Sequence, residues 1–302
     1  MIFRKTGSHI SLMVQLQSKS SKAALAKLVY IGGYGRSGST LLEYLLTAHP
    51  GVVACGEVER HLRSSHRKRT CTCRRRMQDC PIWHPFQRKS GRLMDWSHEE
   101  LTLAMRKHVS AEYAVMVDSS KTAWGSLSMP FGLFRKVGRD FLLVHLVRDP
   151  SGVCWSAMRK PRRSNNGSRP SSRLFESLQA AIGWTASNLA CEIFGWSHPK
   201  NYLRVRYEDL VHTPAEVIGG VLRRVSLSAP ANFEPSDAKD NRHQLYGNAM
   251  RFRPLSLAGL REDMAWKTLM PRSYRILTRT LCWPLLLRYG YAGKIHELGR
   301  RL

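Results

Sequence analysis

A glycine-rich segment, residues 33–40 with the sequence GYGRSGST, has the composition of a loop that binds phosphate. Glycines let the backbone wrap so that several N–H groups face one anion, and the start of a following helix adds positive potential. The spacing from Gly33 to Gly38 is that of a nucleoside-triphosphatase loop, but Ser39 stands where such a loop has lysine. The cation lies within the loop instead, as Arg36. The segment therefore predicts an anion site, and the missing lysine argues against chemistry on the γ-phosphate of ATP.

A second candidate anion site lies at Arg148-Asp149-Pro150, directly after the apolar stretch 141–147. Ser156 follows Arg148 by eight residues. An arginine at the end of a strand and a hydroxyl in the next helix can converge on one phosphate. Two separate anion sites suit a nucleotide with phosphates on both its 5′ and its 3′ side, whereas generic polyanion binding needs no such fixed pair.

Hydrophobic periodicity predicts the elements that must hold these residues. A strand over 24–31 precedes the glycine-rich loop, and a helix over 39–48 follows it. Strand, glycine-rich turn, helix and strand is the opening of a parallel α/β sheet. We expect further strands over 51–55, 113–117, 141–147 and 202–207, and further helices over 96–109, 174–196, 214–225 and, broken near Pro284, 273–287. The sequence thus predicts a three-layer α/β fold with a central parallel sheet, and site residues at the carboxyl ends of its strands.

The loop and the Arg148 motif together resemble those of sulfotransferases that use 3′-phosphoadenosine-5′-phosphosulfate (PAPS), and the segments 243–252 and 287–291 resemble the bacterial type of that family. The resemblance extends, motif by motif, from about Leu28 to Tyr291. It implies the P-loop-like sulfotransferase fold and in-line transfer of a sulfonate group from PAPS to a hydroxyl or amine acceptor, with no metal required. It also implies that Arg148 and Ser156 bind the 3′-phosphate. The residues implied to bind the 5′-phosphosulfate are Gly35, Arg36, Ser37, Gly38, Ser39 and Thr40.

The same resemblance implies catalytic roles. Glu57, just after the second predicted strand, matches the family's general base, and Glu59 is the alternative. Lys121, which ends the segment after the strand over 113–117, is similar to the lysine that stabilises the leaving group, and Arg36 is expected to act on the same reacting group. Arg251 lies in a segment, residues 243–252, that resembles the loop covering the cofactor, and is our candidate contact to the 3′-phosphate.

Three clustered cysteines, Cys71, Cys73 and Cys80, could place thiolates on a metal. They contain no Cys-x-x-Cys pair and no clear fourth ligand, although His66 and His84 lie near. The interpretation favoured by the sequence is therefore reduced or redox-labile thiols in an insertion near the acceptor site, and we assign no metal ligands. Metal binding is the alternative.

The charge balance, 48 Lys and Arg against 22 Asp and Glu for a net charge of +26, favours an anionic partner. Two alternative functions are compatible with this charge: a phosphotransferase using ATP and Mg²⁺, and a basic polyanion-binding protein without catalysis. We expect no specific nucleic-acid partner. A carbohydrate, a lipid or a small metabolite remains open as the acceptor.

The predicted domain organisation is a basic, disordered tail over 1–25 and one sulfotransferase domain over 26–302, with a basic, cysteine-containing insertion around 60–90. No run of ~18 uncharged apolar residues is present, so we expect no transmembrane segment and a cytoplasmic location.

Overall fold

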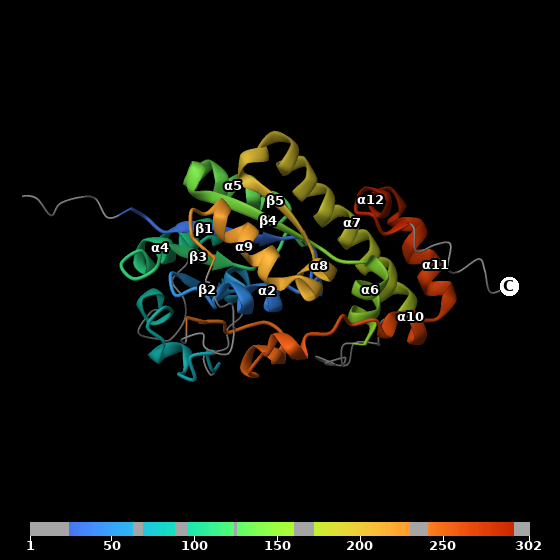
Figure 1. Cartoon of the computed structure of the whole chain (residues 1–302), viewed down its shortest axis with the longest axis horizontal. Helices are drawn as coiled ribbons and strands as arrows, with labels where there is room; N and C mark the ends of the chain where they lie inside the picture. The colour runs from blue at the N-terminus through green and yellow to red at the C-terminus, as the bar shows by residue number, and fades with distance from the viewer. Residues whose placement is uncertain are drawn as a thin grey trace, which may run out of the picture.

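A five-stranded parallel sheet, in the order β2-β3-β1-β4-β5, forms the centre of the computed structural model (Figure 1). Every residue of β2, β3 and β4 is buried, as expected for strands covered on both faces. All five predicted strands are present; β4 has its predicted bounds, whereas β1 begins at Lys27 rather than at residue 24. The strands are β1 (Lys27–Gly32), β2 (Val52–Gly56), β3 (Val115–Asp118), β4 (Phe141–Val147) and β5 (Tyr202–Arg206). The structure describes residues 24–62, 69–87, 96–123, 126–159, 172–229 and 241–292.

Helices pack on both faces of the sheet and complete three layers (Figure 1). Because side chains alternate along a strand, Val29 and Ile31 of β1 face one helical layer, and Leu28 and Tyr30 face the other. The predicted three-layer α/β fold is confirmed. The first layer contains α2 (Ser39–Leu46), α8 (Tyr207–His212) and α9 (Pro214–Arg224), and the second contains α4 (His98–Val109), α5 (Met129–Val137) and α7 (Arg173–Ser197).

A further group of helices gathers at the end of the molecule where β4 leads into α6 (Figure 1). They share a core with α7 in which Trp184, Trp266 and Tyr291 are buried. Pro150 opens α6, and the Asp149 carboxylate caps it by accepting a hydrogen bond from the Ser151 N–H at 2.8 Å. The group contains α6 (Pro150–Met158), α10 (Ala265–Leu269), α11 (Arg272–Leu281) and α12 (Trp283–Arg288). The helix predicted over 273–287 is thus divided into α11 and α12.

The predicted cysteine-containing insertion is described only in part, as α3 (Val58–Leu62) and the segment 69–87. That segment forms turns and two short 3₁₀ helices, Met77–Asp79 and His84–Phe86, and buries side chains against the core beside β2. The tail predicted over 1–25 lies almost entirely outside the described residues. Within the described part of the chain, no helix has both the length and the hydrophobicity that crossing a bilayer requires.

Candidate active site

The glycine-rich loop connects β1 to α2 at the carboxyl edge of the sheet. Gly33 has φ +104°, and a Cβ there would lie 2.4 Å from the carbonyl oxygen of Leu146 in β4. Gly38 has φ +99°, and a Cβ there would lie 2.6 Å from the Tyr207 ring. Both positions require glycine, since another side chain would collide as well as strain the backbone. Arg36 has φ +73°, a left-handed conformation that is uncommon outside glycine and often marks functional sites.

The loop presents donors to a common region. α2 begins at Ser39, has no acidic residue in its first turn, and directs its first backbone N–H groups toward the loop. The Ser37 hydroxyl is buried and has no hydrogen-bond partner among the described residues. Thr40 Oγ1 accepts a hydrogen bond from the Asn248 N–H at 3.4 Å. A buried hydroxyl without a partner, beside a helix start, fits a site that an anion completes.

Glu57 and Lys121 are brought together because they follow β2 and β3, which are neighbours in the sheet. The Lys121 ammonium donates to Glu57 Oε1, and Arg60 Nη1 donates to Glu57 Oε2 at 3.1 Å. Burial raises the pKa of Glu57, but the positive charges and hydrogen bonds of Lys121 and Arg60 outweigh burial and hold that pKa below its ordinary value of 4.5. Glu57 is therefore ionised at neutral pH.

The backbone around Lys121 is fixed by the neighbouring strand and loop. The Tyr30 hydroxyl of β1 donates to the Lys121 carbonyl at 2.5 Å, and the Gly33 N–H donates to Thr122 Oγ1 at 2.8 Å. Lys121 itself has φ +69°. Its side chain passes close to Gly35, where a Cβ would lie 4.0 Å from Lys121 Cδ. The ammonium is thus positioned between the loop and Glu57.

Glu59, the alternative base, lies in the short helix α3 and is partly exposed. Its N–H donates to Ser120 Oγ at 3.0 Å.

Arg148 lies at the carboxyl end of β4, next to β1 in the sheet. Its guanidinium is buried, stacks on the Tyr207 ring with 4.4 Å to the centroid, and donates through Nη1 to the Arg36 carbonyl at 3.1 Å. Nη2 donates to Asp263, to the backbone oxygen at 3.0 Å and to the carboxylate at 3.2 Å. Ser156 is partly exposed in the second turn of α6. The two predicted anion sites are therefore adjacent, with Arg36 and Arg148 in direct contact.

Arg251 lies near Glu57 and next to Gly247, where a Cβ would lie 3.3 Å from Thr40 Oγ1 of the loop. Its Nη1 donates to the Gly247 carbonyl at 2.9 Å. Burial lowers the pKa of Arg251, the nearby charge of Arg69 lowers it further, and the Glu57 carboxylate raises it. Arg69 and Glu57 lie beside β2, whereas Arg148 follows β4, which is not adjacent to β2 in the sheet. The assignment of Arg251 to the 3′-phosphate stays a prediction.

Two carboxylates at the site had not been expected from the sequence. Glu43 is buried in α2, where its Oε1 accepts from the Gly56 N–H at 3.0 Å and its Oε2 accepts from Gln244 Nε2 at 2.5 Å. Burial raises the pKa of Glu43 to about 8, against the opposing effects of a Ser119 hydrogen bond and the Lys121 charge. Glu43 thereby holds the residue before Glu57. Its signal in the sequence is a glutamate among the leucines of the helix, whereas Asp263 has no such signal.

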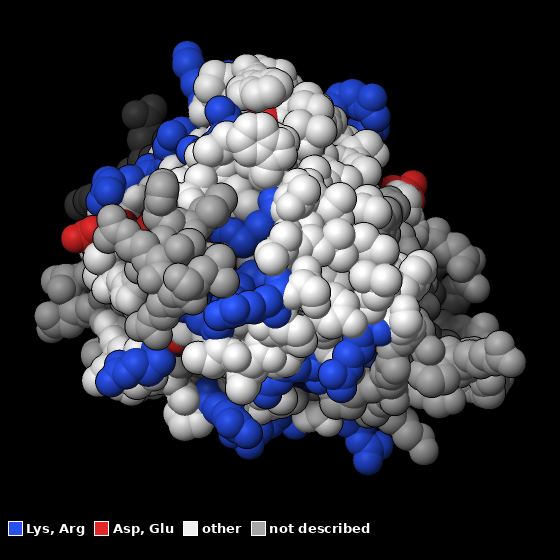
Figure 2. Space-filling view, turned by 90° about the vertical axis from the view of Figure 1, so that its right-hand side faces the viewer, with Lys and Arg blue, Asp and Glu red and all other residues white. Residues whose placement is uncertain are grey.

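Figure 2 views the molecule from the end where α6, α10 and α11 lie. Lys and Arg side chains gather in a hollow near the middle of this face, and Asp and Glu are few. The carboxyl end of β4, with Arg148, leads into α6 on this side. Such a concentration of positive charge in a concave surface raises the local concentration of anions.

Comparison with known proteins gives one family match and several structural matches. The model of the Sulfotransferase family matches residues 29–231, more than half of the chain. The sulfotransferase domain from the curacin biosynthetic pathway has a TM-score of 0.54 at 18% identity, over 87% of this chain and 98% of that domain. The sulfotransferase domain of the Synechococcus PCC 7002 olefin synthase has a TM-score of 0.51 at 19% identity, over 86% of this chain and 95% of that domain.

A mouse sulfotransferase, SULT7A1 complexed with PAP, has a TM-score of 0.52 at 13% identity, over 100% of this chain and 97% of the mouse protein. At these identities the solved structures establish a common fold. The search of curated proteins gave no match.

Proposed function

Because this chain belongs to the sulfotransferase family and is thus an enzyme of sulfonate transfer, we propose that PAPS is its donor and that a hydroxyl or amine is its acceptor. The observation that carries the proposal is the contact between the two anion sites, in which Arg148 Nη1 lies 3.1 Å from the Arg36 carbonyl. One nucleotide with phosphates on its 5′ and 3′ sides can occupy adjacent sites at the ends of β1 and β4. The mouse sulfotransferase of the same fold is complexed with PAP, the nucleotide that remains when PAPS loses its sulfonate.

The residues that would hold PAPS divide between these two sites. Backbone N–H groups of the loop and the first turn of α2, from Gly35 to Thr40, would bind the 5′-phosphosulfate together with the buried Ser37 hydroxyl. Arg148 and Ser156 would bind the 3′-phosphate. Arg148 already holds a carboxylate oxygen of Asp263 at 3.2 Å, and a phosphate offers the same guanidinium a stronger charge-assisted pair. Arg251 would add positive charge from the β2 side.

The chemistry assigned to the chain's own residues is an acid–base and electrostatic one. PAPS supplies a sulfonate group whose sulfur forms a bond to the acceptor oxygen or nitrogen as its bond to the 5′-phosphate oxygen breaks. The ionised Glu57 takes the proton that the acceptor loses. Lys121 and Arg36 offset the negative charge that grows on the departing phosphate. The Lys121 ammonium has three donors, so it can stay on Glu57 while it donates to the phosphate.

A phosphotransferase that uses ATP and Mg²⁺ is the less favoured alternative. It would need the loop lysine that Ser39 replaces, whereas Arg148 would have no partner in a nucleotide without a 3′-phosphate.

Ligand-dependent thermal stability tests the donor. PAP at 100 times its dissociation constant should stabilise the native state by about 2.7 kcal/mol, because a ligand bound only by the folded chain shifts the unfolding equilibrium. This corresponds to a rise in Tm of several degrees, read by differential scanning fluorimetry. ATP with Mg²⁺ at the same concentration should give a much smaller rise. An equal rise with ATP, or none with PAP, would contradict the proposal.

A further inference from the structure

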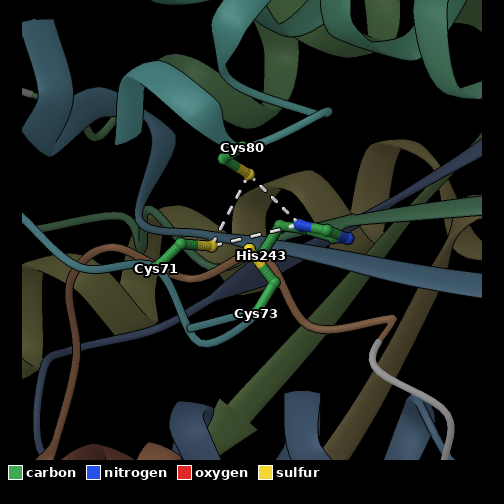
Figure 3. A group of neighbouring side chains, drawn as sticks. All are labelled: Cys71, Cys73, Cys80 and His243. Atoms are coloured by element: carbon green, nitrogen blue, oxygen red, sulfur yellow. Dashed lines mark hydrogen bonds between the residues drawn. The ribbon is translucent and has the colours of Figure 1, made fainter. Parts of the chain in front are cut away.

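Three cysteines of the insertion meet a histidine from far along the chain (Figure 3). Sγ of Cys71, Cys73 and Cys80 and a ring nitrogen of His243 all lie within 4.8 Å of one another. Cys71, Cys80 and His243 are buried, and Cys73 is partly buried. His243 is 163 residues beyond Cys80, so the fold brings the fourth ligand that the sequence analysis did not find. All seven cysteines are free thiols.

The distances among the ligand atoms of Cys71, Cys80 and His243 are close to those of tetrahedral coordination of one ion. Zinc bonds of ~2.3 Å to sulfur and ~2.0 Å to nitrogen, at tetrahedral angles, separate two sulfur ligands by about 3.8 Å and a sulfur from a nitrogen by about 3.5 Å. The Cys71 and Cys80 sulfurs are 3.7 Å apart. His243 Nδ1 lies 3.2 Å from the Cys80 sulfur and 4.0 Å from the Cys71 sulfur, on either side of the expected value. A disulfide between Cys71 and Cys80 would need a separation of ~2.05 Å.

Backbone hydrogen bonds hold the turns that carry the cysteines. The Cys71 N–H donates to the Arg75 carbonyl at 2.8 Å, and the Cys80 carbonyl accepts from the N–H groups of Trp83 at 3.1 Å and His84 at 2.8 Å. These hydrogen bonds fix the backbone that places the ligand atoms. A ligand set of three thiolates and one imidazole favours zinc over the oxygen-seeking cations Mg²⁺ and Ca²⁺.

We propose that Cys71, Cys73, Cys80 and His243 form a structural zinc site. Four protein ligands close the coordination sphere, which is the arrangement of structural rather than catalytic zinc. From the sequence alone no metal ligands are assigned, and the position of His243 beside the cysteines changes that assignment. The proposed zinc ion takes no part in sulfonate transfer, for which we propose no metal.

The zinc would fasten the insertion to the segment 241–246 beside β2. The His243 N–H donates to the Ala54 carbonyl of β2 at 2.7 Å, and its carbonyl accepts from Trp83 Nε1 at 2.6 Å. The next residue, Gln244, donates to Glu43, and its Cα would lie 3.2 Å from a Cβ at Gly56. Because Gly56 precedes Glu57, loss of the ion should weaken the contacts of Gln244 that support the backbone before the proposed base.

Metal analysis of the full-length protein tests the site. Protein purified without chelator from zinc-supplemented cells should contain one zinc per chain by plasma mass spectrometry. Reconstitution with Co²⁺ should give the visible absorption bands of tetrahedral cobalt with thiolate ligands. His243→Ala should lose most of the metal, and His243→Cys should retain it, because cysteine restores a fourth ligand. Cys154→Ser, a change of a buried cysteine in α6 away from the cluster, should keep the full zinc content.

Stability provides a second readout that does not depend on any activity. Removal of zinc by a chelator should lower the Tm, and added Zn²⁺ should restore it, since metal binding contributes folding free energy. The PAP-induced shift is measured separately, so failure of the zinc site and failure of the donor assignment can be distinguished. Wild-type protein without stoichiometric zinc and without a tetrahedral cobalt spectrum would overturn the proposal. A Cys71–Cys80 disulfide in metal-free wild-type protein would overturn it as well.

Discussion

Replacing Glu57 with glutamine should lower kcat by ~10²–10⁴-fold, the contribution of a positioned general base. Glutamine keeps the size of the side chain but cannot take the acceptor's proton. The affinity for PAP should change little, because Glu57 contacts Lys121 and Arg60 rather than the loop backbone. Initial rates with PAPS and an acceptor found by screening give kcat, and calorimetric titration with PAP gives the affinity. Glu59→Gln is the matched control and should lose far less.

The pH dependence of the reaction is a second test of Glu57 as the general base. Burial raises the pKa of Glu57, but Lys121 and Arg60 outweigh it and hold that pKa below 4.5, so the midpoint of the acidic fall in wild-type kcat/KM should lie below pH 4.5. Lys121→Met removes the charge that stabilises the carboxylate, so the pKa should rise and the acidic limb should move to higher pH. Turnover by Glu57→Gln within a few-fold of wild type, beside a collapse in Glu59→Gln, would transfer the role of base to Glu59.

Replacing Arg36 with alanine should lower both kcat and the affinity for PAPS. Arg36 lies in the loop proposed to bind the reacting phosphosulfate, so its charge should be felt more in the transition state than in the ground state. Removal of one such group typically costs ~10²–10³-fold in kcat. Arg148→Ala and Ser156→Ala, at the proposed 3′-phosphate site, should act mainly on the KM for PAPS. The division between reacting and anchoring phosphates would be wrong if Arg36→Ala changed KM alone.

The strands and the loop were predictable because their signals are local. β4 is a continuous apolar run, and the glycines of the loop are needed where the backbone turns against Leu146 and Tyr207. The pairing of Glu57 with Lys121 follows from their places after strands, since the ends of adjacent parallel strands meet at one edge. The short helices α3, α5, α8 and α10 were not predicted, because a few turns give too little periodicity to distinguish a helix from a loop.

The contacts that the sequence did not predict join distant segments. Asp263 reaches Arg148 across 115 residues, and Gln244 reaches Glu43 across 201. Neither pair has a spacing that a sequence pattern could register. His243 is likewise 163 residues from Cys80, so no local pattern includes it with the cysteines. Without a fourth ligand, the cysteine pattern alone favours free thiols over metal ligands.

The affinity difference between PAP and AMP tests the account most directly, because the two nucleotides differ only in the 3′-phosphate. Wild-type protein should bind PAP roughly 10–100-fold more tightly than AMP in calorimetric titrations, the value of charge-assisted hydrogen bonds from Arg148. Arg148→Ala should lose most of this preference, whereas Arg139→Ala, an exposed arginine before the other end of β4, should keep it. Equal affinity of the wild type for PAP and AMP, or a full preference retained in Arg148→Ala, would contradict the account.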